Sequence, residues 1–265
     1  MSREANKAGV TVKAHIKLDT GMSRTGLFAQ GGKAALEAAD AAERIMALPN
    51  IEVTGMFTHF SVADTPSEKE YTAFQLQNYK IVMDALTARG KRPKTCHASN
   101  SAAIMTLEDA YLDMVREGII LYGMYPDSMP VKDGPLEPVM TMKSRISQVR
   151  ELPKGTTISY GRTYMADKDM VSAVVLAGYA DGFPRRASNE AVFTVNGQRI
   201  RQIGRVCMDM MMTDATGLNV KRGDEVTLFG KGGMSCEELS QIVGTINYEL
   251  TCLVTPRTKR RYIGK

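Results

Sequence analysis

Polar side chains able to hold an anion lie in or directly after four apolar segments in the first half of the chain. Arg24 lies in DTGMSRTG, directly after HIKL, and His59 closes the next apolar segment in FTHF. Asn100 and Ser101 lie in HASNS, where a short strand leads into a helix, and Arg116 lies inside the apolar run MVREGIIL. Taken singly, an exposed arginine or a lone histidine is more often structural than functional. In series, these residues favour a ligand site for an anion that carries a phosphate.

Arg116 is the strongest single indication of a site in this half of the chain. A guanidinium placed within an apolar run needs a partner, because an unpaired buried charge is costly. Gly118, two residues further on, allows the backbone to approach a ligand closely.

A tyrosine stands between a strand-like run and a glycine in GTTISYGRT. The glycine predicts a turn, so we expect Tyr160 to project at the mouth of a site rather than into a core. A phenol with its ordinary pKa of about 10 is a weak base and needs a nearby positive charge to act as one.

No histidines or carboxylates occur at metal-ligand spacing in the sequence, so we predict no metal site.

The elements that would position these residues differ between the two halves of the chain. In the first half, strand-like segments alternate with amphipathic helical segments, and this alternation predicts parallel strands with crossover helices. The strand-like segments are KAHIKLD, IEVTGMFTHF, KTCHASN and MVREGIILYG. Four such strands fit a small open sheet and also fit part of a (β/α)₈ barrel, which needs eight strands, and the pattern alone does not choose between them.

In the second half the pattern changes to short strands linked by turns. Asn196-Gly197 predicts a tight hairpin, because a type I′ turn needs positive φ at both positions. One short helix is expected in SCEELSQIVG, where Ser235 and Glu238 have the spacing of a capping box. The boundary lies in the proline-bearing stretch 125–138, so we predict an α/β domain at 1–136 and a mainly β domain at 137–265.

The composition narrows the class of protein. The chain has 265 residues, of which 43% are hydrophobic and 24% charged, as in a soluble globular protein. No apolar run is long enough to cross a bilayer, and four widely spaced cysteines fit a reduced cytoplasm better than a disulfide framework. The net charge of +5 has no nucleic-acid-binding motif beside it, so we expect neither a nucleic-acid nor a membrane partner.

Several segments carry a resemblance to a known family. They are HIKLDTGMSRTG, GMFTHFSVAD, HASNSAA, VREGIILYGMYP, SYGRTY, GYADGFPR, GRVCMDMMM and INYEL, in this order from about residue 13 to the end. Together they resemble the alanine racemases. The resemblance implies a pyridoxal 5′-phosphate enzyme with a (β/α)₈ barrel followed by a β domain, which interconverts L- and D-alanine and supplies D-alanine for peptidoglycan.

The resemblance also implies a role for individual residues. Tyr160 would be the catalytic tyrosine, and Arg24 would help to position it and the substrate carboxylate. The expected cofactor-binding residues are His59, Asn100, Ser101, Arg116, Gly118 and Ile119, and Tyr179, Met208 and Asp209 would face the substrate. Arg116 would contact the pyridine nitrogen, and because a guanidinium does not give up its proton, that nitrogen stays unprotonated.

A racemase needs acid/base groups on both faces of one carbon. The resemblance implies that Tyr160 reaches the barrel mouth of a partner subunit, so we expect a homodimer with shared sites. A serine racemase of the same family is the close alternative, since one hydroxyl separates the two substrates. A non-catalytic binding or assembly module is the rival from another class of protein.

The sequence departs from the family pattern at two places. No segment resembles KANAYGHG, in which the family carries the lysine that binds the cofactor covalently. We therefore expect the first half of the barrel to be absent from this chain, leaving its C-terminal half, and expect the chain alone to be inactive. In addition, Pro256 stands where some family members carry a tyrosine that contacts the phosphate.

Overall fold

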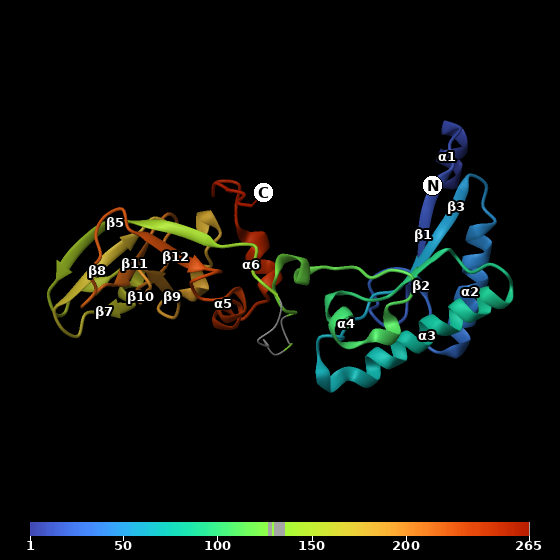
Figure 1. Cartoon of the computed structure of the whole chain (residues 1–265), viewed down its shortest axis with the longest axis horizontal. Helices are drawn as coiled ribbons and strands as arrows, with labels where there is room; N and C mark the ends of the chain where they lie inside the picture. The colour runs from blue at the N-terminus through green and yellow to red at the C-terminus, as the bar shows by residue number, and fades with distance from the viewer. Residues whose placement is uncertain (127–128, 130–135, 265) are drawn as a thin grey trace. The chain divides into compact units, whose positions relative to one another are not determined.

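A computed structural model describes residues 1–126, 129 and 136–264 of the chain (Figure 1). The described residues form two compact units, one containing Met1–Leu121 and the other beginning at Tyr122. Each unit has its own sheet and its own buried core. The stretch 125–138, where the sequence places the domain boundary, includes residues that lie outside the described part.

The first unit is built on a sheet of four parallel strands in the order β2-β1-β3-β4. The strands are β1 (Val12–Asp19), β2 (Leu27–Phe28), β3 (Ile51–Phe57) and β4 (Thr95–His97). The helices are α1 (Ser2–Ala8), α2 (Gly32–Met46), α3 (Lys69–Ala88) and α4 (Ser101–Thr106). Figure 1 shows α2 and α3 together beside the sheet, and the core between them holds Leu18, Met56 and Tyr79. The parallel α/β arrangement predicted for this half is confirmed.

The fourth strand of the sheet is not the one that the sequence predicts. The expected strand in MVREGIILYG is absent, since Met114 makes only an isolated parallel bridge to His97 and Ile119–Tyr122 is a 3₁₀ helix. The fourth strand is instead β2, which is only two residues long and pairs with Leu18 and Asp19. The carbonyls of Cys96 and Ser99 accept the backbone N–H groups of Asp113 and Arg116, so this part of the chain is fixed at separate points rather than along a ladder.

The second unit is a closed barrel of six antiparallel strands in the order β10-β11-β8-β5-β12-β9. The strands are β5 (Met142–Leu152), β8 (Met170–Val175), β9 (Val192–Val195), β10 (Gln198–Ile203), β11 (Met211–Asp214) and β12 (Glu225–Phe229). A separate pair, β6 (Thr157–Ile158) and β7 (Tyr164–Met165), precedes β8. The mainly β character predicted for this half is confirmed.

Two local predictions for the second half, a hairpin and a capping box, are confirmed. Asn196 and Gly197 have φ of 50° and 76° and join β9 to β10, as a tight hairpin requires. The capping box at Ser235 and Glu238 opens α5 (Cys236–Val243). A second helix, α6 (Asn247–Leu253), follows α5, whereas the sequence predicts only one. No helix among the described residues is long and apolar enough to cross a membrane.

Three of the short 3₁₀ helices among the described residues carry predicted site residues. The short 3₁₀ helices are η1 (Pro66–Glu68), η2 (Glu108–Ala110), η3 (Ile119–Tyr122), η4 (Tyr160–Arg162), η5 (Tyr179–Asp181) and η6 (Arg185–Ala187). A 3₁₀ turn closes each three-residue step with a backbone hydrogen bond. The predicted site residues in η3, η4 and η5 are therefore held by local backbone geometry.

Candidate functional site

Arg116 is the most heavily bonded of the predicted site residues. Its Nη1 lies 2.6 Å from Nδ1 of His97. Its Nη2 donates to the carbonyls of Thr58 and Ala98, each at 2.9 Å, and lies 3.3 Å from Nδ1 of His59. A guanidinium can only donate, so both histidines present an unprotonated Nδ1 to it.

The strand order of the first unit explains why these partners meet. Thr58 and His59 follow β3 and His97 ends β4, and the carboxyl ends of adjacent parallel strands lie at the same edge of a sheet. The ring of Phe57, the last residue of β3, stacks on His97 with centroids 5.0 Å apart. The guanidinium carbon of Arg116 lies 5.5 Å from the centroid of the Phe57 ring.

Both histidines that face Arg116 are held in the neutral form. Burial lowers the pKa of His97 to about 4, helped by the charge of Arg116 and by His15. Burial likewise lowers the pKa of His59 to about 4, helped by the charges of Arg116, Arg24 and Lys17. Neutral imidazoles next to a permanent cation are consistent with their role as acceptors.

A second set of predicted residues lies at the start of α4. The side chain of Asn100 caps this helix by accepting the N–H of Ala103 at 3.1 Å. The backbone N–H of Gly118 donates to the hydroxyl of Ser101 at 2.8 Å, which leaves the hydroxyl proton of Ser101 available to a ligand. A side chain at position 118 would press against that hydroxyl, since a Cβ would lie 3.0 Å from it. Ile119 is buried beside this contact.

Arg24 lies in a loop that is fixed at its base. The carboxylate of Asp19, at the end of β1, accepts the backbone N–H groups of Gly21, Met22 and Ser23 at 3.2, 3.1 and 2.8 Å. The side chain of Arg24 is exposed. Its charge contributes to lowering the pKa of His59, so Arg24 and His59 belong to one electrostatic neighbourhood.

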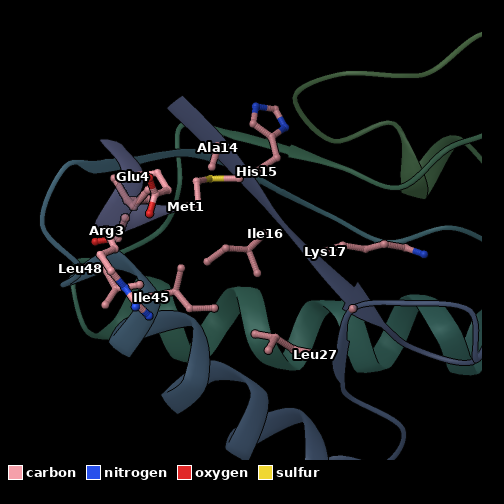
Figure 2. Close-up of a pocket in the computed structure, with 13 residues that line it drawn as sticks. Met1, Arg3, Glu4, Ala14, His15, Ile16, Lys17, Leu27, Ile45 and Leu48 are labelled. Carbon is pink, nitrogen blue, oxygen red and sulfur yellow. The ribbon is translucent and has the colours of Figure 1, made fainter. Parts of the chain in front are cut away.

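An open groove of about 900 Å³ runs along β1 in the same unit (Figure 2). Its apolar wall includes Ile16, Leu27 and Ile45, while His15 and Lys17 contribute polar side chains from β1. Burial lowers the pKa of Lys17, and the charge of Arg24 adds to this effect. Figure 2 shows Ile16 directed toward the helices and His15 directed away from them.

In the second unit, Tyr160 is carried by a turn with unusual backbone angles. Ser159, Gly161 and Arg162 have φ of 66°, 71° and 51°. Such angles are unfavourable for residues other than glycine, and strained backbone of this kind clusters at functional sites. The Ser159 hydroxyl stabilises the turn by donating to the carbonyl of Arg205 at 2.7 Å. The Tyr160 side chain is 71% exposed, as expected for a group at a mouth.

Tyr179 and Met208 lie on two loops that are bonded directly to each other. The backbone N–H of Tyr179 donates to the carbonyl of Cys207 at 3.1 Å, and that of Ala180 to the carbonyl of Met208 at 3.0 Å. Gly178 makes this approach possible, because a Cβ there would lie 2.1 Å from the Cys207 oxygen. The thiol of Cys207 lies 3.5 Å from the hydroxyl of Ser159, which connects these loops to the turn of Tyr160.

Asp209 is fixed by an arginine near the end of the chain. Nη2 of Arg257 lies 2.5 Å from Oδ1 of Asp209, and its Nε lies 3.1 Å from Oδ1 of Asp181. The hydroxyl of Thr258 also donates to the carbonyl of Asp181, at 3.1 Å. The C-terminal segment therefore binds both loops that carry predicted substrate-side residues.

The predicted site residues thus form two groups, one in each unit. The first unit holds Arg24, His59, Asn100, Ser101, Arg116, Gly118 and Ile119, and the second holds Tyr160, Tyr179, Met208 and Asp209. The sequence places His97 at the junction of a strand and a helix, but sequence reasoning assigned neither His97 nor His15 nor Arg257 to the site. The signal for His97 was available, since HASNS ends a strand next to that of His59.

Two family models match the chain. The C-terminal domain of alanine racemase matches residues 139–262, and the N-terminal domain of alanine racemase matches residues 1–126. Alanine racemase of Methanococcus maripaludis is 43% identical over 264 residues, which is 98% of this chain and 69% of that protein. The chain belongs to the alanine racemase family. Alanine racemase of Desulfovibrio desulfuricans is 39% identical over 267 residues, 99% of this chain and 69% of its own length.

Solved structures of alanine racemases also superpose closely on this chain. The enzyme of Clostridium difficile 630 superposes with a TM-score of 0.88 at 39% identity, over 97% of this chain and 66% of its own. The enzyme of Streptomyces lavendulae, a D-cycloserine producer, superposes with a TM-score of 0.90 at 32% identity, over 100% of this chain and 69% of its own. The chain therefore spans about two thirds of the length of these relatives.

The family match corrects one expectation. We predicted that the first half of the barrel is absent, but the N-terminal domain of the family matches residues 1–126, which does not support that prediction. The predicted inactivity of the chain rested on the same absence and is also unsupported. An α/β unit followed by a β unit agrees with the domain order of the family.

Alanine racemases depend on pyridoxal phosphate, and residues of the first unit fit that cofactor at two points. Four protein acceptors orient the Arg116 guanidinium, yet no acceptor within the described residues takes its Nε–H. That N–H is available to an acceptor such as a pyridine nitrogen. No acceptor in the described part of the chain takes the hydroxyl proton of Ser101, which lies beside a glycine that leaves space and suits a phosphate oxygen.

Proposed function

We propose that the chain supplies the machinery for interconverting L-alanine and D-alanine with pyridoxal phosphate. The observation that carries the proposal is Arg116, a guanidinium held by two backbone carbonyls and two neutral imidazoles. So much fixed orientation at one side chain is expected of a residue that must meet a ligand in a single geometry. The reaction itself, the interconversion of L- and D-alanine, is inferred from membership of the alanine racemase family.

Residues of the first unit would hold the cofactor. Arg116 would donate to its ring nitrogen and His59 would lie beside the ring. Asn100, Ser101, Gly118 and Ile119 would surround its phosphate. Bound pyridoxal phosphate acts as an electron sink that makes the α-proton of an amino acid acidic. Arg116 would moderate that sink, because it leaves the ring nitrogen without a proton of its own.

Tyr160 would hold or move a proton on one face of the substrate. Its exposed phenol needs a cation to act as a base, and the guanidinium of Arg24 is the one we assign. Arg24 would orient the substrate carboxylate, and Met208, Asp209 and Tyr179 would line the substrate side of the site.

The test is turnover by the purified chain with added pyridoxal phosphate, followed as the optical conversion of D-alanine, with L-serine measured in parallel. We expect Tyr160→Phe to lower kcat by about 100-fold or more, as loss of a general acid/base does. Tyr262→Phe is the matched control, since Tyr262 is 92% exposed in the C-terminal segment. Equal turnover of all three proteins, or faster turnover of serine than of alanine, would contradict the proposal.

We further propose that the chain works as a homodimer with shared sites in the cytoplasm. The clustering of exposed Tyr160, Tyr179 and Met208 on one set of loops supports an interface there. Mixing a Tyr160→Phe protein with an Arg116→Leu protein tests the sharing. Mixed dimers should recover activity that neither variant has alone, whereas an inactive mixture argues for sites built within one chain.

A further inference from the structure

His15 adds a hydrogen bond behind His97 that the proposed function does not use. Its Nδ1 lies 2.9 Å from Nε2 of His97, whose Nδ1 lies 2.6 Å from Nη1 of Arg116. His97 is 4% exposed, whereas His15 is exposed at the edge of the groove along β1 (Figure 2). The chain of bonds therefore runs from the most constrained residue of the site to solvent.

The direction of each hydrogen bond follows from Arg116. Because a guanidinium never accepts, Nδ1 of His97 must accept, and the proton of neutral His97 must be on its Nε2. That Nε2–H then donates to Nδ1 of His15, so neutral His15 must carry its own proton on Nε2. A protonated His15 would bring two N–H groups face to face and break the chain. Both tautomers are thus determined by one permanent charge.

The register of the sheet shows how residues on non-adjacent strands can meet. His15 is on β1 and His97 is on β4, with β3 between them. Residue 55 of β3 pairs with His15 on one side and with Thr95 on the other. It is a glycine, and a Cβ there would lie 2.4 Å from the His15 ring. The missing side chain of Gly55 is the gap through which His15 reaches His97.

The register is also adjusted at this point. The pairing of β1 with β3 shifts between Ala14 and His15, so that Ala14 pairs with Val53 and His15 with Gly55. Without this irregularity, His15 would lie opposite Thr54, whose side chain is β-branched. Two independent features, a glycine and a bulge, therefore serve the same contact.

We propose that His15 is a positioning residue that holds His97, and through His97 the guanidinium of Arg116, with Gly55 as the spacer that allows it. Only the purpose of this positioning, which is to hold Arg116 for the cofactor, rests on the proposed function. The contact itself is a property of the chain without cofactor. His15 is the acceptor that keeps the His97 ring from rotating about its bond to Arg116.

The test is nitrogen NMR of the cofactor-free full chain, which has only three histidines. We expect a through-hydrogen-bond coupling between Nε2 of His97 and Nδ1 of His15, and separate, slowly exchanging signals for the two Nη groups of Arg116. His15→Leu and Gly55→Ala should each abolish the coupling and average the Arg116 signals. His15→Asn should keep the Arg116 signals separate, because its amide oxygen replaces Nδ1 as acceptor.

Gly32→Ala is the matched control for Gly55→Ala, since nothing lies within 4 Å of a Cβ at that position. If Gly55→Ala unfolds, His15→Leu alone decides. Separate Arg116 signals in His15→Leu, or no coupling in the unmodified chain, would overturn the proposal.

Titration with pyridoxal phosphate then tests whether the positioning of Arg116 serves cofactor binding. We expect a roughly tenfold weaker affinity for His15→Leu, by analogy with residues that hold the ligands of a metal ion. No binding by the unmodified chain would refute the proposed function and leave the His15 contact standing.

Discussion

Nη2 of Arg257 lies 2.5 Å from Oδ1 of Asp209, and this contact joins the C-terminal segment to the loop that carries Met208. The same guanidinium reaches Asp181 through Nε at 3.1 Å. One side chain thus links the two loops on which we place the substrate-side residues. Since the Arg257 side chain is 52% exposed, the link contributes more to geometry than to stability.

Replacing Arg257 should therefore change substrate binding more than folding. We expect Arg257→Gln to raise KM for alanine several-fold, while the free energy of unfolding changes by less than about 1 kcal/mol. Steady-state kinetics and urea unfolding measure the two quantities. Lys143→Gln is the control, because Lys143 forms a comparable exposed pair with Glu225 at 2.7 Å on the barrel. An unchanged KM in Arg257→Gln would remove Arg257 from the site.

Gly178 should tolerate no side chain. A Cβ at this position would lie 2.1 Å from the carbonyl oxygen of Cys207 and 2.4 Å from that of Met208, and a backbone oxygen cannot move aside as a flexible side chain can. We expect Gly178→Ala to destabilise the second unit by about 3 kcal/mol, the upper range for overpacking. Chemical denaturation followed by near-UV circular dichroism measures the change. Gly32→Ala in α2 should be neutral or stabilising, and equal effects of the two substitutions would contradict the close approach of the loops.

In the turn of Tyr160, the contribution of the Ser159 hydrogen bond to stability can be separated from the cost of backbone strain. Ser159→Gly removes the hydroxyl bond to Arg205 but relaxes the backbone at φ 66°, so two opposing effects of about 1 kcal/mol each should leave its stability close to that of the unmodified chain. Ser159→Ala removes the same bond and keeps the strain, so it should cost about 1 kcal/mol more than the glycine variant. Unfolding free energies of the three proteins measure both differences. If alanine proves as stable as glycine at this position, the left-handed turn is not the native geometry.

Acid should destabilise the first unit through His97. The folded state holds the pKa of His97 near 4, whereas in the unfolded chain it titrates near 6.5. Between these values the unfolded chain binds a proton that the folded unit does not. The stabilisation is therefore complete above about pH 6.5 and is lost as the pH falls toward 4, by at most about 3 kcal/mol. His59, whose pKa is also lowered to about 4, acts in the same direction.

Urea unfolding between pH 7.5 and 4 measures this dependence. His97→Asn provides the comparison, since its amide oxygen can still accept from Arg116 but does not titrate in this range. The variant should lose less stability on acidification than the unmodified chain. Identical pH profiles would show that His97 is not buried as a neutral base.

Elements with a repeating pattern could be predicted from the sequence, and those set by single long-range contacts could not. The apolar runs of β1 and β3 and the hairpin at Asn196-Gly197 each carry their own local signal. The run around Arg116 reads as a strand, yet that arginine bonds to carbonyls 58 and 18 residues away, and they determine its path instead. β2 is two residues long and has no period to detect.

The site shows the same division. Residue types and strand ends indicated Arg116, His59 and Ser101 as a group. The contact of His15 with His97 joins residues 82 apart and depends on a register shift and a glycine on a third strand, none of which a motif records. Positive φ at Ser159 and Arg162 is equally invisible, because neither residue type favours it.

The barrel of the second unit closes on itself, so each of its six strands has a neighbour on both sides. A ring has no outermost strand from which fraying can begin, whereas the parallel sheet of the first unit ends at β2 and β4. Under conditions that favour partial opening, amide protons of the ring should exchange with deuterium last. The loops that carry Tyr179 and Met208 are anchored in the part of the chain that loosens least.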